Sequence, residues 1–151
     1  MIVYRLAKLE YANSLQSSGS PNRWNRAQQF VIYTSGTMSL CALELLAHSS
    51  GLKPAGTYRM MKIEMDEPIS QTDFKENDLP ENWSSLSAYE LTQTLGSNWY
   101  ASKKSLVLRV PSAIITSENN YVINTMHPDY PNKVRLVGAD IFFWDKRFPP
   151  Y

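Results

Sequence analysis

The sequence predicts a single α+β domain with mixed or antiparallel sheets, and two observations lead to this prediction. Short β-prone stretches separated by Pro, Asn and Gly turns recur along the chain, and the helical segments do not alternate regularly with them. Regular alternation would instead indicate a doubly wound parallel sheet. With 151 residues, 43% of them hydrophobic, the chain can bury roughly 70% of its unfolded surface in one core. We therefore expect one domain over residues 1–151.

The N-terminal part predicts two strands joined by a polar loop. Residues 2–7 alternate between two faces, as in a half-buried strand, and Arg5 lies on a face with two small apolar neighbours. Residues 11–21 are rich in Ser, Asn and Gly and show no period, so they predict a loop that leads to residues 23–25. Residues 30–34 are β-branched and aromatic and predict the second strand.

The run 38–48 predicts a helix that begins near Thr37 and is capped by Gly51. Hardly any polar side chain interrupts this run, so we expect the helix to be buried on most sides. Glu44 lies in its middle, where its neighbours one helical turn away are mostly apolar. Because an unpaired buried carboxylate is expensive, Glu44 needs either a cation partner or a role in a site.

The second half of the chain adds a long loop, a short helix and further strands. Residues 57–65 alternate and predict a strand, whereas residues 66–84 contain six acidic residues and no period, and predict a lid or a surface loop. Ser87 and Glu90 indicate a capping box for a short helix that ends at Gly96. The remaining strands are predicted at residues 106–110, 114–115, 121–123 and 134–144.

Charge and motif content exclude several function classes. Fifteen Lys and Arg against 14 Asp and Glu give a net charge of +1, without the basic excess that direct nucleic-acid binding needs. No run of about 18 apolar residues predicts a membrane span, and Cys41, the only cysteine, fits a reducing cytosol and core packing. Since the standard nucleotide-loop and metal-ligand motifs are also absent, we expect no metal and a cytoplasmic location.

Two explanations for Glu44 are open from the residues alone. In the structural one, a buried ion pair with Arg5 or Arg23 satisfies the carboxylate, and the chain is a non-catalytic binding module. In the functional one, the carboxylate belongs to an active site. Glu44→Gln separates them, because the first explanation predicts lost stability and the second predicts lost activity with the fold intact.

Ser112 follows Pro111 at the end of a predicted strand, where a nucleophile could lie. The G-x-S-x-G elbow of serine hydrolases is absent around it, so a hydrolase would need His48 or His127 to reach Ser112 through the fold. The simpler interpretation of His48 is a helix-end residue facing the negative end of the helix dipole.

Six short motifs lie in a fixed order along the chain. They are Tyr4-Arg5, Arg23-Trp24-Asn25, Val31-Ile32-Tyr33-Thr34, Ala42-Leu43-Glu44-Leu45, Pro111-Ser112-Ala113, and Asn120-Tyr121 to Asn124 with His127-Pro128. This pattern resembles the RES domain family, the toxin half of bacterial toxin–antitoxin modules, over nearly the whole of residues 1–151. The family takes its name from an Arg, a Glu and a Ser that align with Arg5, Glu44 and Ser112. The chain departs from the family pattern at Pro21-Asn22, where two glycines are usual, and at Asn124-Thr125, where Asn-Pro is usual.

The resemblance implies a fold related to ADP-ribosyltransferases and a toxin that degrades NAD by phosphorolysis or hydrolysis of the nicotinamide–ribosyl bond. NAD is then the substrate and no cofactor is needed, while inorganic phosphate is a candidate co-substrate. Some relatives instead transfer ADP-ribose to a protein, which is the alternative activity. The resemblance also implies growth arrest, a cognate Xre- or MbcA-like antitoxin as partner, and a homodimer within the toxin–antitoxin complex as a candidate assembly.

The residue chemistry agrees with what the resemblance implies. Cleavage of the nicotinamide–ribosyl bond creates an oxocarbenium-like centre, which the Glu44 carboxylate can stabilise. Arg5 and Arg23 supply planar, bidentate donors for the pyrophosphate or for an attacking phosphate. Tyr33 can stack on the nicotinamide or ribose, and the Ser112 hydroxyl can orient the substrate. The expected catalytic residues are Glu44, Arg5 and Ser112, and the expected substrate-binding residues are Arg23, Tyr33, Tyr4 and Asn124.

Overall fold

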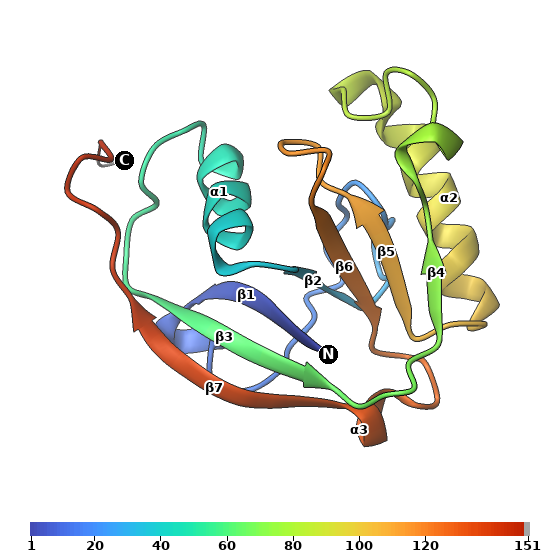
Figure 1. Cartoon of the computed structure of the whole chain (residues 1–151), viewed down its shortest axis with the longest axis horizontal. Helices are drawn as coiled ribbons and strands as arrows, with labels where there is room; N and C mark the ends of the chain where they lie inside the picture. Colours follow the sequence, from blue (N-terminus) through green and yellow to red (C-terminus); the bar gives the residue numbers. More distant parts are fainter. Residues whose placement is uncertain (150–151) are drawn as a thin grey trace.

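The computed structural model describes residues 1–149, whose strands form one seven-stranded sheet of order β4-β5-β6-β2-β1-β3-β7 (Figure 1). The strands are β1 Ile2–Lys8, β2 Val31–Ser35, β3 Tyr58–Met65, β4 Gln71–Asp73, β5 Val107–Pro111, β6 Asn119–Asn124 and β7 Val134–Phe142. Strands β4 and β5 pair in parallel, whereas every other neighbouring pair is antiparallel. The predicted α+β class with a mixed sheet is confirmed.

The sheet divides into two halves at its centre. Strands β1 and β2 pair only at Tyr4 and Ser35, while β1 and β3 pair along seven residues and β2 and β6 along five. Strands β7, β3 and β1 therefore diverge from strands β2, β6, β5 and β4 (Figure 1). Backbone pairing is nearly absent at this division, which leaves room for side chains from both halves.

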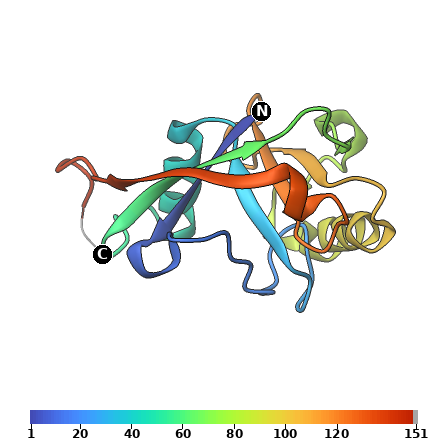
Figure 2. The same cartoon turned by 90° about the horizontal axis from the view of Figure 1, so that it is seen from below.

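Helix α1 (Met38–His48) packs on β1 and β2 and so covers the division between the two halves. Its predicted ends are confirmed: the Thr37 hydroxyl accepts the Leu40 N–H at 3.1 Å, and Gly51, at φ +78°, donates its N–H to the Leu46 carbonyl at 2.9 Å. In Figure 2, seen from below, strands β2 and β6 lie between α1 and α2 (Tyr89–Ser102). The third helix, α3, spans Tyr130–Lys133.

The expectation that the helix 38–48 is buried on most sides is wrong. Only Leu40, Cys41 and Leu46 are buried, and Ala47 and His48 are exposed. The face of α1 that carries these three residues packs on β1 and β2. The opposite face is left for a cleft and for solvent.

The prediction of a short helix that begins at Ser87 and ends at Gly96 is also wrong. A 3-10 turn at Leu86–Ala88 leads into α2 without a side-chain cap, and α2 continues to Ser102. Gly96 lies inside α2, where a Cβ atom would come within 1.9 Å of the Trp24 carbonyl oxygen. The glycine therefore permits close packing of the helix on the backbone at Trp24, and it is not a terminator.

Two further predicted segments differ in the structure. Residues 114–115 are a loop rather than a strand, because the chain turns after Ser112 and the amides of Ile114 and Ile115 donate to its hydroxyl. Residues 66–84 are irregular as expected, but they include β4 and a 3-10 turn at Glu76–Asp78. Among residues 1–149, no helix combines the length and the apolar character that crossing a membrane requires.

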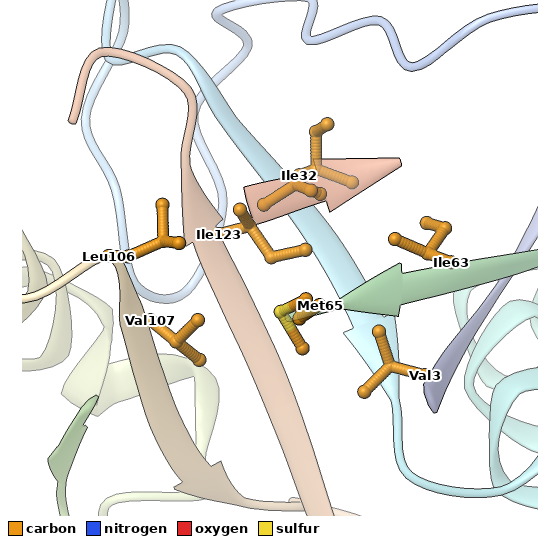
Figure 3. Packing of buried hydrophobic residues seen from close by; sticks show 8 residues of the cluster. Val3, Ile32, Ile63, Met65, Leu106, Val107 and Ile123 are labelled. Carbon is orange, nitrogen blue, oxygen red and sulfur yellow. The ribbon is translucent and has the colours of Figure 1, made fainter. Parts of the chain in front are cut away.

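Three clusters of apolar side chains form the core, and the smallest contains the buried residues Ala7, Ala12 and Met61. The first lies where the two halves of the sheet meet (Figure 3), and its buried members are Val3, Ile32, Ile63, Met65, Leu106, Val107, Ile123 and Val134. The second contains three buried tryptophans, Trp24, Trp83 and Trp99, packed with apolar residues of β5 and β6. The second cluster fixes the segment before β2 and the segment before α2 against each other.

Candidate active site

Glu44 is held by two neutral donors through a single carboxylate oxygen. Ser112 Oγ donates to Glu44 Oε1 at 2.8 Å, and Asn120 Nδ2 donates to the same oxygen at 2.5 Å. The Asn120 amide is itself fixed, because Ser35 Oγ donates to its Oδ1 at 2.7 Å. Within residues 1–149, no hydrogen bond reaches Glu44 Oε2. The side chain is therefore oriented by one oxygen and presents the other.

The structural explanation of Glu44 as a member of an ion pair is wrong. No cation of the described residues lies within 4.0 Å of its carboxylate. Arg5 Nη1 donates to the Gln16 carbonyl at 2.7 Å, and Arg23 donates to backbone carbonyls elsewhere. Glu44 is only half-buried, so two hydrogen bonds and contact with solvent satisfy a charge that full burial would have forced to pair.

A cleft of two adjoining compartments surrounds Glu44. The residues shared by both are Asn22, Tyr33, Glu44, His48 and Asn120. The first compartment, of about 230 Å³, is closed by apolar and aromatic side chains that include Leu86 and Tyr89. The second, of about 180 Å³, lies against β1, β2 and α1 and includes Arg5. Glu44 thus lies between an aromatic compartment and one that carries a positive charge.

Arg5 supplies the charge of the second compartment. Burial lowers the pKa of its guanidinium, but an arginine keeps its proton at neutral pH even so. Its one hydrogen bond to the described residues uses Nη1, which leaves further donors of the fork for a ligand. This geometry is compatible with the anion-binding role expected of Arg5.

Tyr33 lines both compartments, and its hydroxyl is bound by neighbouring protein groups. The hydroxyl donates to Asn25 Oδ1 at 2.8 Å and accepts the Trp24 N–H at 3.0 Å, and burial raises its pKa above the usual range. It is therefore a neutral, fully engaged group. The ring packs against the tryptophan cluster, and its stacking on a substrate stays a prediction.

The Arg23 guanidinium, in contrast, is already engaged. Nη1 donates to the Trp83 carbonyl at 2.8 Å and to the Ser85 carbonyl at 3.3 Å, while Nη2 donates to the Ser84 carbonyl at 2.8 Å. Arg23 still lines the first compartment. Both terminal nitrogens of the fork are occupied by protein.

Two of the expected substrate-binding residues do not line the cleft. Asn124 is fully buried at the other end of β6 from Asn120, where it donates to the Tyr100 carbonyl at 3.1 Å and accepts the Met126 N–H at 3.0 Å. Tyr4 lies opposite Ser35 at the single β1–β2 pairing and contributes to neither compartment.

The serine hydrolase arrangement does not form in the described residues. Ser112 has no exposure to solvent, and its hydroxyl donates to Glu44 rather than to a histidine. His127 Nδ1 accepts the Asp129 N–H at 3.1 Å. His48 reaches the cleft, but it makes no hydrogen bond to Ser112.

Cys41 packs in the interior, as predicted. Its sulfur accepts the Leu6 N–H at 3.1 Å, and burial raises the pKa of the thiol to about 12. The thiol is therefore protonated at neutral pH and has no nucleophilic role.

Sequence reasoning missed three residues of the cleft: Asn120, Ser35 and His48. Asn120 lies in one of the six motifs, yet nothing in the sequence shows that it reaches Glu44. That contact depends on the register of β6 against β2, which places Asn120 opposite Ser35. The spacing of four residues between Glu44 and His48 on α1 was the one available signal, because such residues share a helix face.

A comparison with protein families finds that the RES domain model matches residues 2–145. The chain belongs to the RES domain family. A RES relative from Photorhabdus laumondii, named Toxin Res, is 31% identical over 97% of this chain and 96% of its own length. The Prs ADP-ribosylating toxin of a Sphingobium species is 31% identical over 82% of this chain and 80% of its own.

The fold is that of a solved toxin–antitoxin structure. The M. tuberculosis MbcT–MbcA complex contains a chain that matches with a TM-score of 0.77, over 93% of this RES domain and 83% of that chain. Sequence identity to it is 15%, so this likeness concerns the fold.

Proposed function

We propose that this RES domain is the toxin of a toxin–antitoxin pair and that it breaks the nicotinamide–ribosyl bond of NAD. The observation that carries the proposal is the state of Glu44, which lines both compartments, is fixed through Oε1 by Ser112 and Asn120, and has no hydrogen-bond partner for Oε2 among residues 1–149. A carboxylate oriented in this way suits the stabilisation of positive charge on a ribose, or the orientation of a ribose hydroxyl.

In the proposed reaction, the bond between ribose C1′ and the nicotinamide nitrogen breaks, and its electron pair leaves with nicotinamide. The ring is positively charged in NAD and becomes neutral as it departs, so no general acid is needed. Glu44 Oε2 stabilises the oxocarbenium-like ribose, and an acceptor oxygen then forms the new bond to C1′ while its proton passes to solvent. Water gives hydrolysis, and inorganic phosphate gives phosphorolysis.

The two compartments divide the binding task in this proposal. The Tyr33 ring, which belongs to the lining of both compartments, stacks on the nicotinamide or ribose. Arg5 offers its free donors to a phosphate of the substrate. Ser112 and Asn120 act on Glu44 rather than on the substrate. Tyr4 and Asn124, which lie outside the cleft, support the strands and have no contact with substrate.

A second activity has one specific observation in its favour. The Sphingobium relative named a Prs ADP-ribosylating toxin covers 82% of this chain at 31% identity. The same Glu44 chemistry serves either activity, because an ADP-ribosyltransferase-like site differs only in the acceptor that attacks C1′. The alternative is therefore transfer of ADP-ribose to a protein.

An experiment with NAD that carries a label on its adenine ring distinguishes these outcomes. The purified protein is incubated with this NAD, with and without inorganic phosphate, and with a bacterial lysate. We expect free nicotinamide in every case and label on small products only. Label on a protein band would favour the transferase activity, and intact NAD under all three conditions would contradict the proposed function.

The toxin role is tested in cells. Expression of the chain alone should lower NAD and arrest growth, and co-expression of an antitoxin encoded beside it should restore both. Sequence similarity to proteins named Toxin Res and structural similarity to the MbcT–MbcA complex support this expectation. Normal growth and normal NAD at a high level of folded protein would contradict it.

A further inference from the structure

The turn at residues 83–85 directs three consecutive backbone carbonyls at one side chain. The Arg23 guanidinium donates hydrogen bonds to all three carbonyls, at 2.8, 2.8 and 3.3 Å. The same guanidinium lies over the ring of Tyr89, with 4.8 Å to the centroid, and near the ring of Trp83 at 5.8 Å. Arg23 therefore joins residues 83–89 to the segment that precedes β2.

We infer that Arg23 is a positioning residue, which holds Leu86 and Tyr89 as the outer wall of the first compartment, and that this wall sets affinity for the substrate. The inference rests on the proposed function for the identity of the substrate. It assigns Arg23 a role different from the phosphate binding that its sequence motif suggests.

The hydrogen bonds of Arg23 favour the positioning role. Bidentate binding of a phosphate needs two N–H groups from one edge of the fork. Here Nη1 gives both of its N–H groups and Nη2 gives one to carbonyls of the turn, so the Nη1–Nη2 edge could bind a phosphate only by displacing the turn. Three carbonyls left without a donor would then have to find water. The Nε–Nη2 edge keeps two N–H groups without a partner among residues 1–149.

The Leu86 part of the outer wall depends most on that clamp, whereas Tyr89 begins α2, which Gln93 and Glu90 also tie to residues 22 and 26. Leu86 is 82% exposed and so gains little from packing, although it lines the first compartment together with Tyr89. The turn itself has only local backbone bonds, from Trp83 N–H to the Pro80 carbonyl and from Ser85 N–H to the Asn82 carbonyl. The buried Trp83 ring and Arg23 are its links to the rest of the protein.

Arginine is the residue that this geometry requires. Its planar fork reaches three carbonyls spread along a turn while its face stacks on an aromatic ring. A lysine ammonium in the same place is a point donor on a flexible stem, and it cannot cover the three carbonyls or stack in the same way. Arg23→Lys should therefore resemble Arg23→Ala, although it keeps the positive charge.

The first experiment needs no activity. A Glu-specific protease is applied to the native protein, and cleavage after the exposed Glu81 is followed by mass spectrometry. If Arg23 holds the turn, Arg23→Ala and Arg23→Lys should be cut there several times faster than wild type. Arg147→Ala is the matched control, since the Arg147 side chain is 90% exposed and its ion-pair partner among residues 1–149 is Asp145. Equal cleavage rates in wild type and both Arg23 variants would overturn the inference.

The second experiment is a double-mutant cycle on nicotinamide release, with Arg23→Ala, Leu86→Ala and the double variant. If Arg23 acts through the wall, each single variant raises KM for NAD by about tenfold with kcat little changed, and the double variant is no worse than Arg23→Ala alone. If Arg23 binds phosphate directly, the two increases multiply, which would overturn the inference. Should the wild type release no nicotinamide, the proposed function fails, while the protease experiment still decides the role of Arg23.

Discussion

Ser112 Oγ donates a hydrogen bond of 2.8 Å to Glu44 Oε1 from a position with no exposure to solvent. The same hydroxyl oxygen accepts the N–H groups of Ile114 and Ile115, at 3.0 and 3.2 Å. Ser112 therefore connects the loop after β5 to the carboxylate on α1. We propose that Ser112 positions Glu44 and does not act as a nucleophile.

Replacing Ser112 by Ala should lower both stability and turnover. Two backbone N–H groups lose their acceptor, which costs about 1–3 kcal/mol of unfolding free energy. Glu44 loses one of its two orienting donors, so kcat for nicotinamide release should fall by up to about a hundredfold without being abolished. Urea unfolding and steady-state kinetics measure the two effects, with the exposed Ser14→Ala as control. Complete loss of activity in a stable Ser112→Ala protein would argue for direct chemistry at Ser112.

Asn120→Asp should move the pH profile. The Asn120 amide nitrogen lies 2.5 Å from Glu44 Oε1, so an aspartate there places two carboxylates in contact. Like charges at this distance oppose ionisation and raise the pKa of the pair, and Glu44 must be ionised to act. The acidic limb of kcat against pH should therefore shift upward by about one unit or more. Asn119→Asp adds the same charge on the neighbouring residue and should leave the limb in place; equal profiles for the two variants would contradict the assignment of Asn120.

Gly96→Ala should destabilise the fold although alanine favours helices. The new Cβ would lie 1.9 Å from the Trp24 carbonyl oxygen, so α2 or the segment at Trp24 has to move. We expect a loss of about 1–3 kcal/mol in thermal or urea unfolding, against the gain of up to about 1 kcal/mol that alanine brings to a helix. Gly138→Ala is the control, because its Cβ meets only Lys62 Cβ at 3.8 Å. A stabilised Gly96→Ala protein would show that the close approach is not real.

Cys41 should resist alkylation in the folded protein. Burial raises its thiol pKa to about 12, so at pH 8 the thiol is protonated in the native state, whereas an ordinary cysteine is partly ionised there. Iodoacetamide at pH 8 should modify it only after addition of denaturant, at a rate limited by unfolding. Rapid labelling of the native protein would show that the second compartment opens to Cys41.

Local patterns predicted much of the fold. Alternation identified the strands that begin at Ile2 and Tyr58, and Thr37 and Gly51 marked both ends of α1. These features depend on neighbouring residues. The role of Gly96 could not be predicted, because it depends on contact with Trp24, 72 positions earlier, and a glycine in a helical run looks the same when it is a terminator.

The candidate site was predicted only in part, because some of its features are local in the sequence and others depend on long-range contacts. Glu44 was identifiable as a carboxylate on an otherwise apolar helix. Its hydrogen-bond donor Ser112 was named as a separate candidate. The structure adds their direct contact and the second donor, Asn120, which the β2–β6 register brings to the same oxygen. Arg23 shows the limit of residue chemistry: its charge indicated an anion site, whereas the fold offers it three carbonyls of a turn 60 residues away.

Nicotinamide release from NAD by Glu44→Gln tests the central claim most directly. Glutamine can keep an oxygen where Ser112 and Asn120 donate, and it replaces the unpartnered Oε2 by a neutral NH2 group, so the fold should persist with a cooperative unfolding transition close to wild type. We expect the wild type to release nicotinamide and Glu44→Gln to be slower by about a thousandfold or more. Release by the variant at a rate near that of wild type would contradict the assignment of Glu44 as the catalytic carboxylate.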